Sequence, residues 1–319
     1  MSKTLKILSR PKGNAEEYGR WSVNPYLGCS HGCLYCYLKK GPGAKTLGGN
    51  IATLKKGVVN EDHAFHLAMA EIIENREEIV KDGGLFMTFT SDPCNEHTYK
   101  LFSRISESAR EMGIPITMLT KADLPAAYIF CDSIIPSKFL LGNKERETAI
   151  HEYLANCQKK ASLLAIGFTL TGHDELEPNA STNEERIREI DFLTKRFSPS
   201  KECHVWASIE PVIDFESSFE MIQLALDAGC EHFKIGLLTN NTKPCRDKYD
   251  VDECVDFINK VMMLTRDKAT VYWKQSVRDF IRTSRKPALT DDELSKVFDS
   301  WPNSVDKNYS MFTSNDYGK

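Results

Sequence analysis

NPYLGCSHGCLYCY, residues 24–37, is the stretch of this sequence with the most demanding chemistry. Its three cysteines, Cys29, Cys33 and Cys36, follow a C-x-x-x-C-x-x-C spacing, and Gly28 and Gly32 let the backbone wrap around them. Three thiolates this close can bind three irons of a four-iron cluster, which needs four ligands. The fourth iron would lack a protein thiolate and stay open to a small molecule. The spacing therefore predicts a reactive iron–sulfur centre.

Two other cysteine chemistries match the pattern less well. A structural zinc site takes four Cys or His ligands, commonly from two C-x-x-C pairs, and no second pair follows this loop although His31 lies within it. A disulfide framework is disfavoured because ten cysteines in 319 residues is a low density and most of them stand alone. The zinc site stays open as the alternative, in a non-catalytic binding protein.

The loop CSHGCLYC resembles the cluster loop of the radical S-adenosylmethionine (SAM) enzymes, including Tyr35 before the last cysteine. The flanking NPY and Tyr37 resemble the branch related to spore photoproduct lyase, a group of DNA repair photolyase-like proteins. The resemblance implies a [4Fe-4S] cluster on Cys29, Cys33 and Cys36, with SAM bound at the open iron. It also implies reductive cleavage of SAM to a 5′-deoxyadenosyl radical, which abstracts a hydrogen atom from the substrate.

Composition limits the classes of function. The chain has 41 basic and 45 acidic residues, a net charge of −4, so no strong overall field directs it to nucleic acid or to an acidic membrane. No apolar run approaches the roughly eighteen residues that span a bilayer, and the N-terminal segment lacks the apolar run of a signal peptide. Together with free cysteines and an oxygen-sensitive centre, these features predict a cytoplasmic protein without membrane attachment.

Strand patterns and amphipathic helix patterns alternate along the chain. We expect strands at residues 21–28, 85–91, 116–121, 163–171, 204–212, 232–238 and 270–274. We expect helices at residues 60–82, 97–111, 144–159, 183–197, 217–228, 252–264, 277–283 and 290–298. Two overlapping capping boxes, Ser181 with Glu184 and Thr182 with Glu185, support the helix that starts at residue 183. The alternation predicts an α/β fold, a partial (β/α)6-type TIM-like barrel of parallel strands with a C-terminal extension.

The alternation contains no gap that would mark a domain boundary. We expect an N-terminal arm at 1–20, a barrel domain at 21–283 and a tail at 284–319. Residues 39–50, KKGPGAKTLGGN, predict a mobile surface loop, either a solvent linker or a loop that folds over a phosphate-bearing substrate. The tail contains three aromatic residues that favour packing on or near the barrel over plain disorder: Trp301, Tyr309 and Phe312.

Polar residues follow the predicted strands at the end where a parallel β/α barrel builds its active site. Four charged residues, Lys121, Glu210, Lys234 and Lys274, stand on otherwise apolar strands. Buried charges are costly unless they are paired or bound to a ligand. We therefore expect these side chains to face a polar barrel interior, either in a ligand site or in an ion-pair network without substrate contact.

The resemblance assigns several of these strand ends to SAM. TSD at residues 90–92 and TK at residues 120–121 match motifs of the lyase-related family, in which the serine and the lysine hold the amino-acid end of SAM. This implies cofactor-binding roles for Ser91 and Lys121, with Asp92 beside them. It also implies that Tyr35 lies near the adenine, mostly through its backbone.

Two further stretches and one departure complete the resemblance. EPNASTNEER and SIEPVID resemble family segments, which implies cofactor contacts for Glu177, Arg186 and Glu210. In the lyase a cysteine directly before TSD returns a hydrogen atom to the product, whereas this chain has Phe89 there. Cys94 is the remaining catalytic candidate, with a small buried thiol as the alternative. The substrate therefore stays open between a nucleic acid and a small molecule, and a reducing partner of flavodoxin or ferredoxin type is implied.

Overall fold

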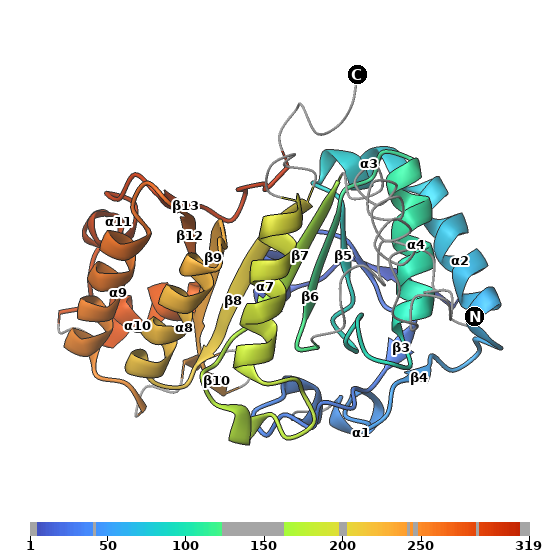
Figure 1. Ribbon diagram of the computed structural model, residues 1–319, viewed down its shortest axis with the longest axis horizontal. Coiled ribbons are helices and arrows are strands. Elements are labelled where there is room, and N and C mark those ends of the chain that lie inside the picture. Colours follow the sequence, from blue (N-terminus) through green and yellow to red (C-terminus); the bar gives the residue numbers. More distant parts are fainter. Residues whose placement is uncertain are drawn as a thin grey trace, which may run out of the picture.

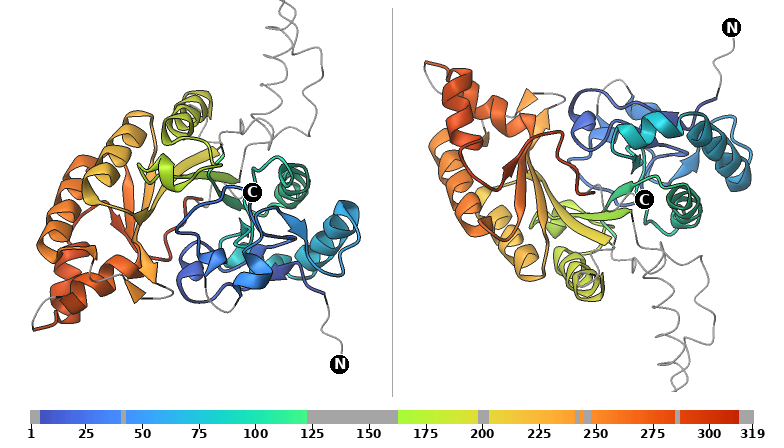
Figure 2. Two further views of the ribbon diagram at one scale, coloured as in Figure 1. Left: turned by 90° about the horizontal axis from the view of Figure 1, so that it is seen from below. Right: turned by 90° about the horizontal axis from the view of Figure 1, so that it is seen from above.

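The computed structural model describes residues 5–40, 43–122, 163–197, 203–240, 243–244, 248–284 and 287–312. Within these residues a nine-stranded sheet forms the centre, in the order β1-β2-β5-β6-β7-β8-β9-β12-β13. Every neighbouring pair runs parallel except β1 with β2. The sheet curls but its edge strands β1 and β13 do not pair, so the barrel is not closed (Figures 1 and 2). The predicted α/β fold with a partial barrel is confirmed.

The strands of this sheet are short at its edges and longest at β8. They are β1 (Leu8–Ser9), β2 (Ser22–Val23), β5 (Leu85–Met87), β6 (Ile116–Thr120), β7 (Leu164–Thr169), β8 (Cys203–Val212), β9 (His232–Leu237), β12 (Thr270–Trp273) and β13 (Ser304–Val305). Two antiparallel ribbons lie outside it: β3 (Tyr26–Leu27) with β4 (Thr53–Leu54), and β10 (Thr239–Asn240) with β11 (Lys243–Pro244).

Helices cover the outer face of the curled sheet (Figure 2). The α-helices are α1 (Ala44–Leu47), α2 (Glu61–Glu74), α3 (Arg76–Lys81), α4 (Tyr99–Glu111), α7 (Asn183–Phe197), α8 (Phe215–Asp227), α9 (Val251–Thr265), α10 (Gln275–Ser284) and α11 (Asp291–Phe298). Among the described residues, 3-10 helices accompany them at η1 (Gly13–Glu17), η2 (Tyr37–Lys39) and η4 (Asp174–Leu176). None of the described helices is both long and apolar enough to cross a membrane.

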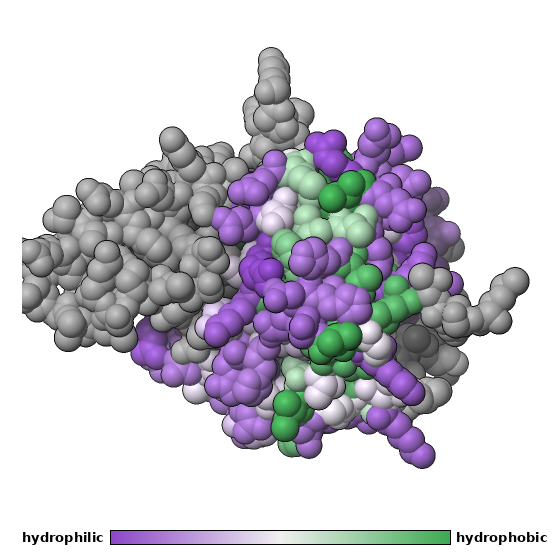
Figure 3. All heavy atoms as spheres, turned by 90° about the vertical axis from the view of Figure 1, so that its right-hand side faces the viewer, coloured by the Kyte–Doolittle hydropathy of each residue, from purple (hydrophilic) through white to green (hydrophobic). Residues whose placement is uncertain are grey.

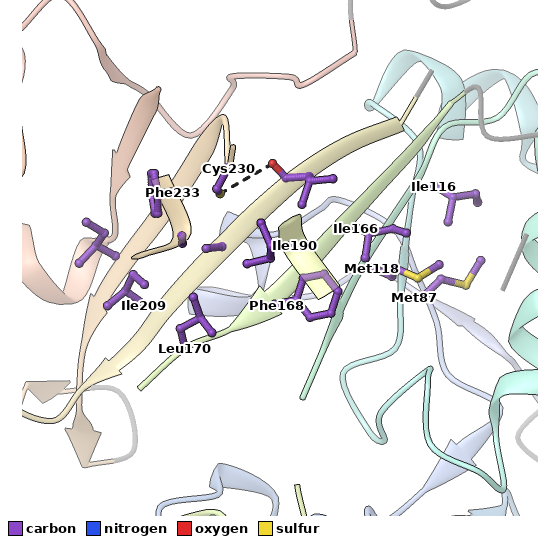
Figure 4. Close-up of a cluster of buried hydrophobic side chains, with 14 of the residues drawn as sticks. Met87, Ile116, Met118, Ile166, Phe168, Leu170, Ile190, Ile209, Cys230 and Phe233 are labelled. Atoms are coloured by element: carbon purple, nitrogen blue, oxygen red, sulfur yellow. Dashed lines mark hydrogen bonds between the residues drawn. The ribbon is translucent and has the colours of Figure 1, made fainter. Parts of the chain in front are cut away.

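The main core lies between the sheet and these outer helices, because alternate residues of each strand point outward. Figure 4 shows this layer crossing from Met87 and Met118 through Ile166 and Phe168 to Phe233, all of them buried. On the side of the molecule that carries α2, hydrophobic surface residues are separated by hydrophilic ones (Figure 3). The main hydrophobic core thus supports the sheet from its outer face.

The inner face of the sheet has a second, smaller core. Phe86, Ala165 and Trp206 pack there with Phe312 from the tail. Gly167 makes this possible, because a Cβ at that position would lie 2.2 Å from the Trp206 ring. The aromatic residues fill the interior near the amino ends of the strands, so the carboxyl ends are left for polar side chains.

The expected strand at 21–28 is wrong as a single element, since β2 belongs to the main sheet and β3 to a separate ribbon. Asn24 stands at the break, and its Nδ2 donates to Ser9 Oγ and Ser22 Oγ, both at 2.8 Å. Its Oδ1 accepts from the backbone nitrogen of Phe89 at 2.8 Å. Pro25 follows and has no N–H to give to a ladder. Side-chain hydrogen bonds therefore replace strand pairing at this point.

Other boundaries also differ from the predictions. The helix expected at 60–82 is split into α2 and α3 at Asn75, whose Nδ2 donates to the carbonyl of Glu71 at 2.7 Å. The strand expected at 85–91 ends at Met87, because Thr88 has a φ of 61°. The segment 39–50, expected to be a loop, contains the end of η2 and all of α1, with residues 41–42 outside the description. The helix expected at 144–159 lies outside the described residues.

Both chain ends join the barrel. The segment predicted as an N-terminal arm contributes β1 to the sheet and η1, whose Glu17 is buried. In the tail, β13 pairs in parallel with β12, and Phe312 is 6% exposed. The described part of the tail thus lies against the sheet, through β13 and Phe312.

Candidate functional site

The cysteine loop lies against the carboxyl ends of the strands and surrounds one pocket. All three cysteines line this pocket, together with His31, Gly32, Leu38, Lys39, Gly48 and Gly49. Gly28 opens the loop with a φ of 90°, and a Cβ there would lie 2.6 Å from the carbonyl oxygen of Ile51. Only glycine fits such a position. The loop therefore closes tightly on the segment that follows it.

The thiols face the pocket without forming a compact single-metal site. Burial raises the pKa of Cys29 to about 12 and also raises the pKa of Cys33. Within the described part of the chain, no group of three or more His, Cys, Asp or Glu side chains is arranged to hold one metal ion. The three cysteines thus share one pocket.

Asp92 ties the cysteine loop to the strand ends. Its Oδ2 lies 3.0 Å from His31 Nε2 and accepts from the backbone nitrogen of Lys121 at 3.0 Å. Its Oδ1 accepts from the Cys94 backbone nitrogen at 2.9 Å and from Thr120 Oγ1 at 2.7 Å. Burial alone would raise the pKa of Asp92, but the charge of His31 and these donors hold it below its ordinary value. Donors of the chain itself occupy both carboxylate oxygens of Asp92. These contacts indicate a structural role beside the predicted cofactor site.

Ser91 presents the opposite case. Its Oγ is buried, and among the described residues it has no hydrogen-bond partner. Its neighbour Thr90 donates to the carbonyl of Tyr26 at 2.5 Å, which fixes the backbone that carries Ser91. A buried hydroxyl without a partner is costly unless a ligand satisfies it. Ser91 therefore fits a hydroxyl reserved for a bound molecule.

Glu177 brings three of the predicted residues together. Its Oε1 lies 3.0 Å from Lys121 Nζ and accepts from the Tyr35 hydroxyl, while its Oε2 accepts from Arg186. Arg186 also donates to the carbonyls of Thr169 and Thr182. The Glu177 and Arg186 side chains are fully buried, whereas Lys121 keeps 15% exposure. The network joins the cysteine loop to β6, β7 and α7.

The electrostatics of this network keep Glu177 ionised. Burial alone would raise the pKa of Glu177, but the cations of Lys121 and Arg186 outweigh it and lower the pKa to about 2. Lys121 Nζ lies 5.4 Å from the centroid of the Tyr35 ring. An ammonium has three donors and Glu177 takes one of them. Among the described residues no other ion-pair partner of Lys121 is present, so two of its donors remain for an anionic group of a ligand.

Glu210 belongs to a second network on β8, β9 and β12. Its Oε2 lies 2.6 Å from Lys274 Nζ and accepts from the hydroxyl of Tyr18. Lys274 is also 3.5 Å from Glu17, and Lys234 Nζ donates to the Glu17 carbonyl at 2.8 Å. The four charged residues of the strands, Lys121, Glu210, Lys234 and Lys274, thus face the interior as expected. Glu210 is paired there with residues of an ion-pair network.

Tyr37 connects the two networks. Its ring is 65% exposed, and its hydroxyl donates to the carbonyl of Phe89 on the inner side of the sheet. The pKa of Tyr37 is raised, first by the protein packed around the hydroxyl and then by negative charge at Cys36 and Glu210. The hydroxyl of Tyr37 thus lies within electrostatic range of both Cys36 and Glu210.

Cys94 lies apart from this interior. It is 1% exposed and belongs to the main hydrophobic core, and burial raises the pKa of its thiol. This is the ordinary environment of a small structural cysteine. The backbone nitrogen of Cys94 donates to Asp92 beside the cysteine loop, and the catalytic role expected for Cys94 stays a prediction.

Several residues of the site were missed in the sequence. Glu17 and Tyr18 come from the N-terminal segment, and Asn95 donates to Ser30 of the cysteine loop. A shortage of carboxylates could have pointed to Glu17. The strands carry two interior lysines, Lys234 and Lys274, but only one carboxylate to pair with them, Glu210. Asn95 is among the polar residues that follow the strand expected at 85–91, so only its partner, Ser30, could not be foreseen, because the two become neighbours only in the folded chain.

Comparisons with known proteins add little to this geometry. No protein-family model matches the chain, and no curated protein matches it. Its structure is similar to the crystal structure of Streptococcus suis SuiB bound to S-adenosylmethionine, with 14% sequence identity and a TM-score of 0.47. The likeness covers 79% of this chain and 49% of the SuiB chain, so this chain spans about half the length of that protein. At this identity no residue's role is carried over.

Proposed function

We propose that this chain is a radical SAM enzyme that binds a [4Fe-4S] cluster and SAM. The observation that carries the proposal is the common pocket of Cys29, Cys33 and Cys36 beside the polar strand ends. When bound, the cluster and SAM would supply a 5′-deoxyadenosyl radical that abstracts a hydrogen atom from the substrate. The substrate is unassigned, and nucleic acids and small molecules both remain candidates.

The cysteine geometry supports a cluster over the alternative of a single zinc ion. A structural zinc needs its four ligands at bonding distance around one centre. In a four-iron cluster each thiolate binds a different iron, so the sulfurs are spread around a larger group. Three cysteines that line one pocket fit the second requirement. Gly28 and Gly32 give the backbone the left-handed turns that such a wrap needs.

The strand ends around the pocket fit the polar groups of SAM. Ser91 Oγ is a buried hydroxyl without a partner, and Lys121 keeps two donors for a carboxylate. Glu177 holds Lys121 and Tyr35 in place, and Arg186 holds Glu177. We therefore propose that Ser91 and Lys121 contact SAM, while Glu177 and Arg186 position them. Asp92 and His31 fix the cysteine loop.

The interior network completes the proposal. We assign Glu210 to the wall of the substrate cavity rather than to direct SAM contact, because its carboxylate is already paired with Lys274 and Tyr18. A cytoplasmic, reducing compartment and an external reductant of flavodoxin or ferredoxin type belong to the same proposal, since the cysteines that the structure describes are free and the centre needs electrons.

The test is anaerobic reconstitution with iron and sulfide, followed by electron paramagnetic resonance of the reduced protein with and without SAM. We expect about four irons per chain, a spectrum altered by SAM, and 5′-deoxyadenosine after reduction. The control replaces Cys29, Cys33 and Cys36 by Ala, and S91A should weaken the effect of SAM while leaving the iron content unchanged. One tightly held zinc, or a cluster whose spectrum ignores SAM, would refute the proposal.

A further inference from the structure

Charge is unevenly distributed around the cysteine loop. Between Glu17 and Glu61 the chain has six basic residues and no acidic one, although the whole chain has a net charge of −4. The basic residues are Arg20, Lys39, Lys40, Lys45, Lys55 and Lys56. The segment that contains the cluster ligands is thus the positive part of an acidic protein.

Three of these lysines form a face on the outer side of the cysteine pocket. Lys39 lines the pocket and ends η2, Lys40 follows it, and Lys45 lies on α1. α1 packs closely on η2. Gly48, which follows α1, lies so near Leu38 of η2 that a Cβ at Gly48 would be 2.9 Å from the Leu38 carbonyl oxygen. We call Lys39, Lys40 and Lys45 the basic face.

The lysines of the basic face are available to a partner. All three are exposed, and no carboxylate of the described residues forms an ion pair with them. The acidic residues on the other flank of the loop already have partners of their own. Glu175 accepts from His173 at 2.7 Å, and Asp174 accepts from Asn183 at 2.6 Å.

Two large apolar side chains of the cysteine loop and of the segment after α1 are exposed, Leu34 on the flank of Leu176 and Ile51 after the turn at Gly48 and Gly49. Leu34, between two of the cysteines, is 66% exposed, and Ile51, whose carbonyl touches the turn at Gly28, is 63% exposed. Exposed apolar residues beside charges of one sign are typical of protein–protein interfaces, where an apolar centre is surrounded by polar groups. A phosphate backbone would use the charges but would leave Leu34 and Ile51 without apolar contact.

We propose that the basic face, with Leu34 and Ile51, is the docking surface for an acidic one-electron carrier protein that reduces the cluster. This inference rests on the proposed function. In each transfer the carrier loses one electron and the cluster gains it, and no bond is formed or broken. The location fits this role, because Lys39 lines the pocket of the cysteines, so a carrier bound there is close to the cluster. Complementary charge raises the rate of such encounters and makes them sensitive to salt.

The experiment compares the reconstituted protein with its K39E/K40E/K45E variant, using reduced acidic ferredoxin as the probe in anaerobic stopped flow. The matched control, K260E/K268E/K296E, makes the same change of charge at exposed lysines near α9 and α11, at the far end of the molecule from α1 (Figure 1). Binding of the same ferredoxin is measured in parallel by interferometry. Dithionite, a small reductant that needs no docking surface, reports whether the cluster itself is intact.

We expect the second-order rate of reduction by ferredoxin to fall roughly tenfold or more in K39E/K40E/K45E at low salt, with weaker binding. The difference should shrink toward about 0.5 M salt, the control should match the wild type, and dividing each ferredoxin rate by the dithionite rate of the same variant removes any change that K39E makes at the pocket itself. Equal ferredoxin rates in the two triple variants would overturn the proposal. So would unchanged ferredoxin kinetics accompanied by lost binding of a labelled single-stranded DNA, which would assign the face to nucleic acid. Absence of any cluster in the wild type would instead refute the proposed function.

Discussion

Arg186 and Glu177 show how much of this site depends on single charged residues. Both side chains are fully buried, and each is the main electrostatic partner of the other together with Lys121. A buried ion pair contributes little net stability over a hydrophobic pair, but removing one partner leaves an uncompensated buried charge. The role of Arg186 is therefore to make an ionised Glu177 tolerable in the interior, and through Glu177 to hold Lys121 and Tyr35.

We predict that R186M lowers the free energy of unfolding by about 3–5 kcal/mol, because Glu177 then keeps only Lys121 as a counter-ion. Urea unfolding followed by circular dichroism measures this loss. The double variant E177Q/R186M should recover a large part of it, since the buried charge is gone. A single variant within about 1 kcal/mol of wild type would contradict the assignment.

Lys234 makes a second prediction possible, on pH dependence. Burial, and next the charge of Lys274, lower the pKa of Lys234 from 10.5 to about 7. Between these two values the unfolded chain binds more protons at this residue than the folded one, so folding stability rises with pH over that window. Relative to K234M, the wild type should therefore gain stability as the pH is raised from about 7 toward 10.

The measurement is urea unfolding of wild type and K234M at several pH values in that window. The matched control is K195M, at a lysine whose side chain is 75% exposed, and its difference from wild type should stay flat with pH. A pH-independent difference for K234M would mean that Lys234 keeps an ordinary pKa in the folded protein.

Among the elements, α7 is the one whose start is best explained by its sequence. Thr182 donates from its hydroxyl to Glu185 Oε2 at 3.0 Å, and the Glu185 backbone nitrogen donates back to Thr182 Oγ1 at 3.2 Å. This is the capping box expected from the Thr182 and Glu185 pair. The backbone nitrogen of Ser181, the other candidate cap, instead donates to the carbonyl of Lys121 at 3.1 Å.

We predict that T182A lowers the free energy of unfolding by about 1 kcal/mol, because the first turn of α7 loses a side-chain acceptor. T182S keeps the hydroxyl and should stay close to wild type. Thermal and urea unfolding of the two variants compare them directly. Equal losses in both would show that the methyl group of Thr182, rather than its hydroxyl, stabilises the helix.

The elements also show where sequence reasoning succeeds and where it stops. The apolar pattern predicts the ends of β6, β8 and β9 to within about one residue, because both faces of these strands are buried in the protein. Near the cysteine loop the patterns fail, since side chains such as Asn24 take over the hydrogen bonds that a strand would use. The site residues on strand ends were predictable from their charge. Tyr18 and Glu17 were not, because their partners lie about 190 or more residues away in the chain.

At the scale of the whole molecule, the interior is divided along the strand axes. Aromatic residues fill the amino ends, and charged residues lie toward the carboxyl ends, where the cysteine loop is attached. Segments from both chain ends contribute to the aromatic floor: Tyr18 packs against Phe86 and Trp206, and Phe312 belongs to the same cluster. The open barrel is thus stabilised from inside by residues at its two ends in sequence.

This arrangement predicts that the tail stabilises the entire barrel and is more than an appendage. Phe312 packs edge-on to His204 at 5.4 Å between ring centroids and lies in the cluster of Trp206. Removing a buried phenylalanine side chain from a core costs about 3–5 kcal/mol, and a segment near the chain end can relax, so we predict a loss of about 2 kcal/mol for F312A. The control F192A removes a ring that is 45% exposed and should change the free energy of unfolding by less than about 0.5 kcal/mol.

Because Phe312 and Trp206 share one cluster, the F312A and W206F effects should be non-additive in a double-mutant cycle measured by urea unfolding. Additive effects, or an F312A variant as stable as wild type, would mean that the aromatic cluster inside the barrel is stable without the tail.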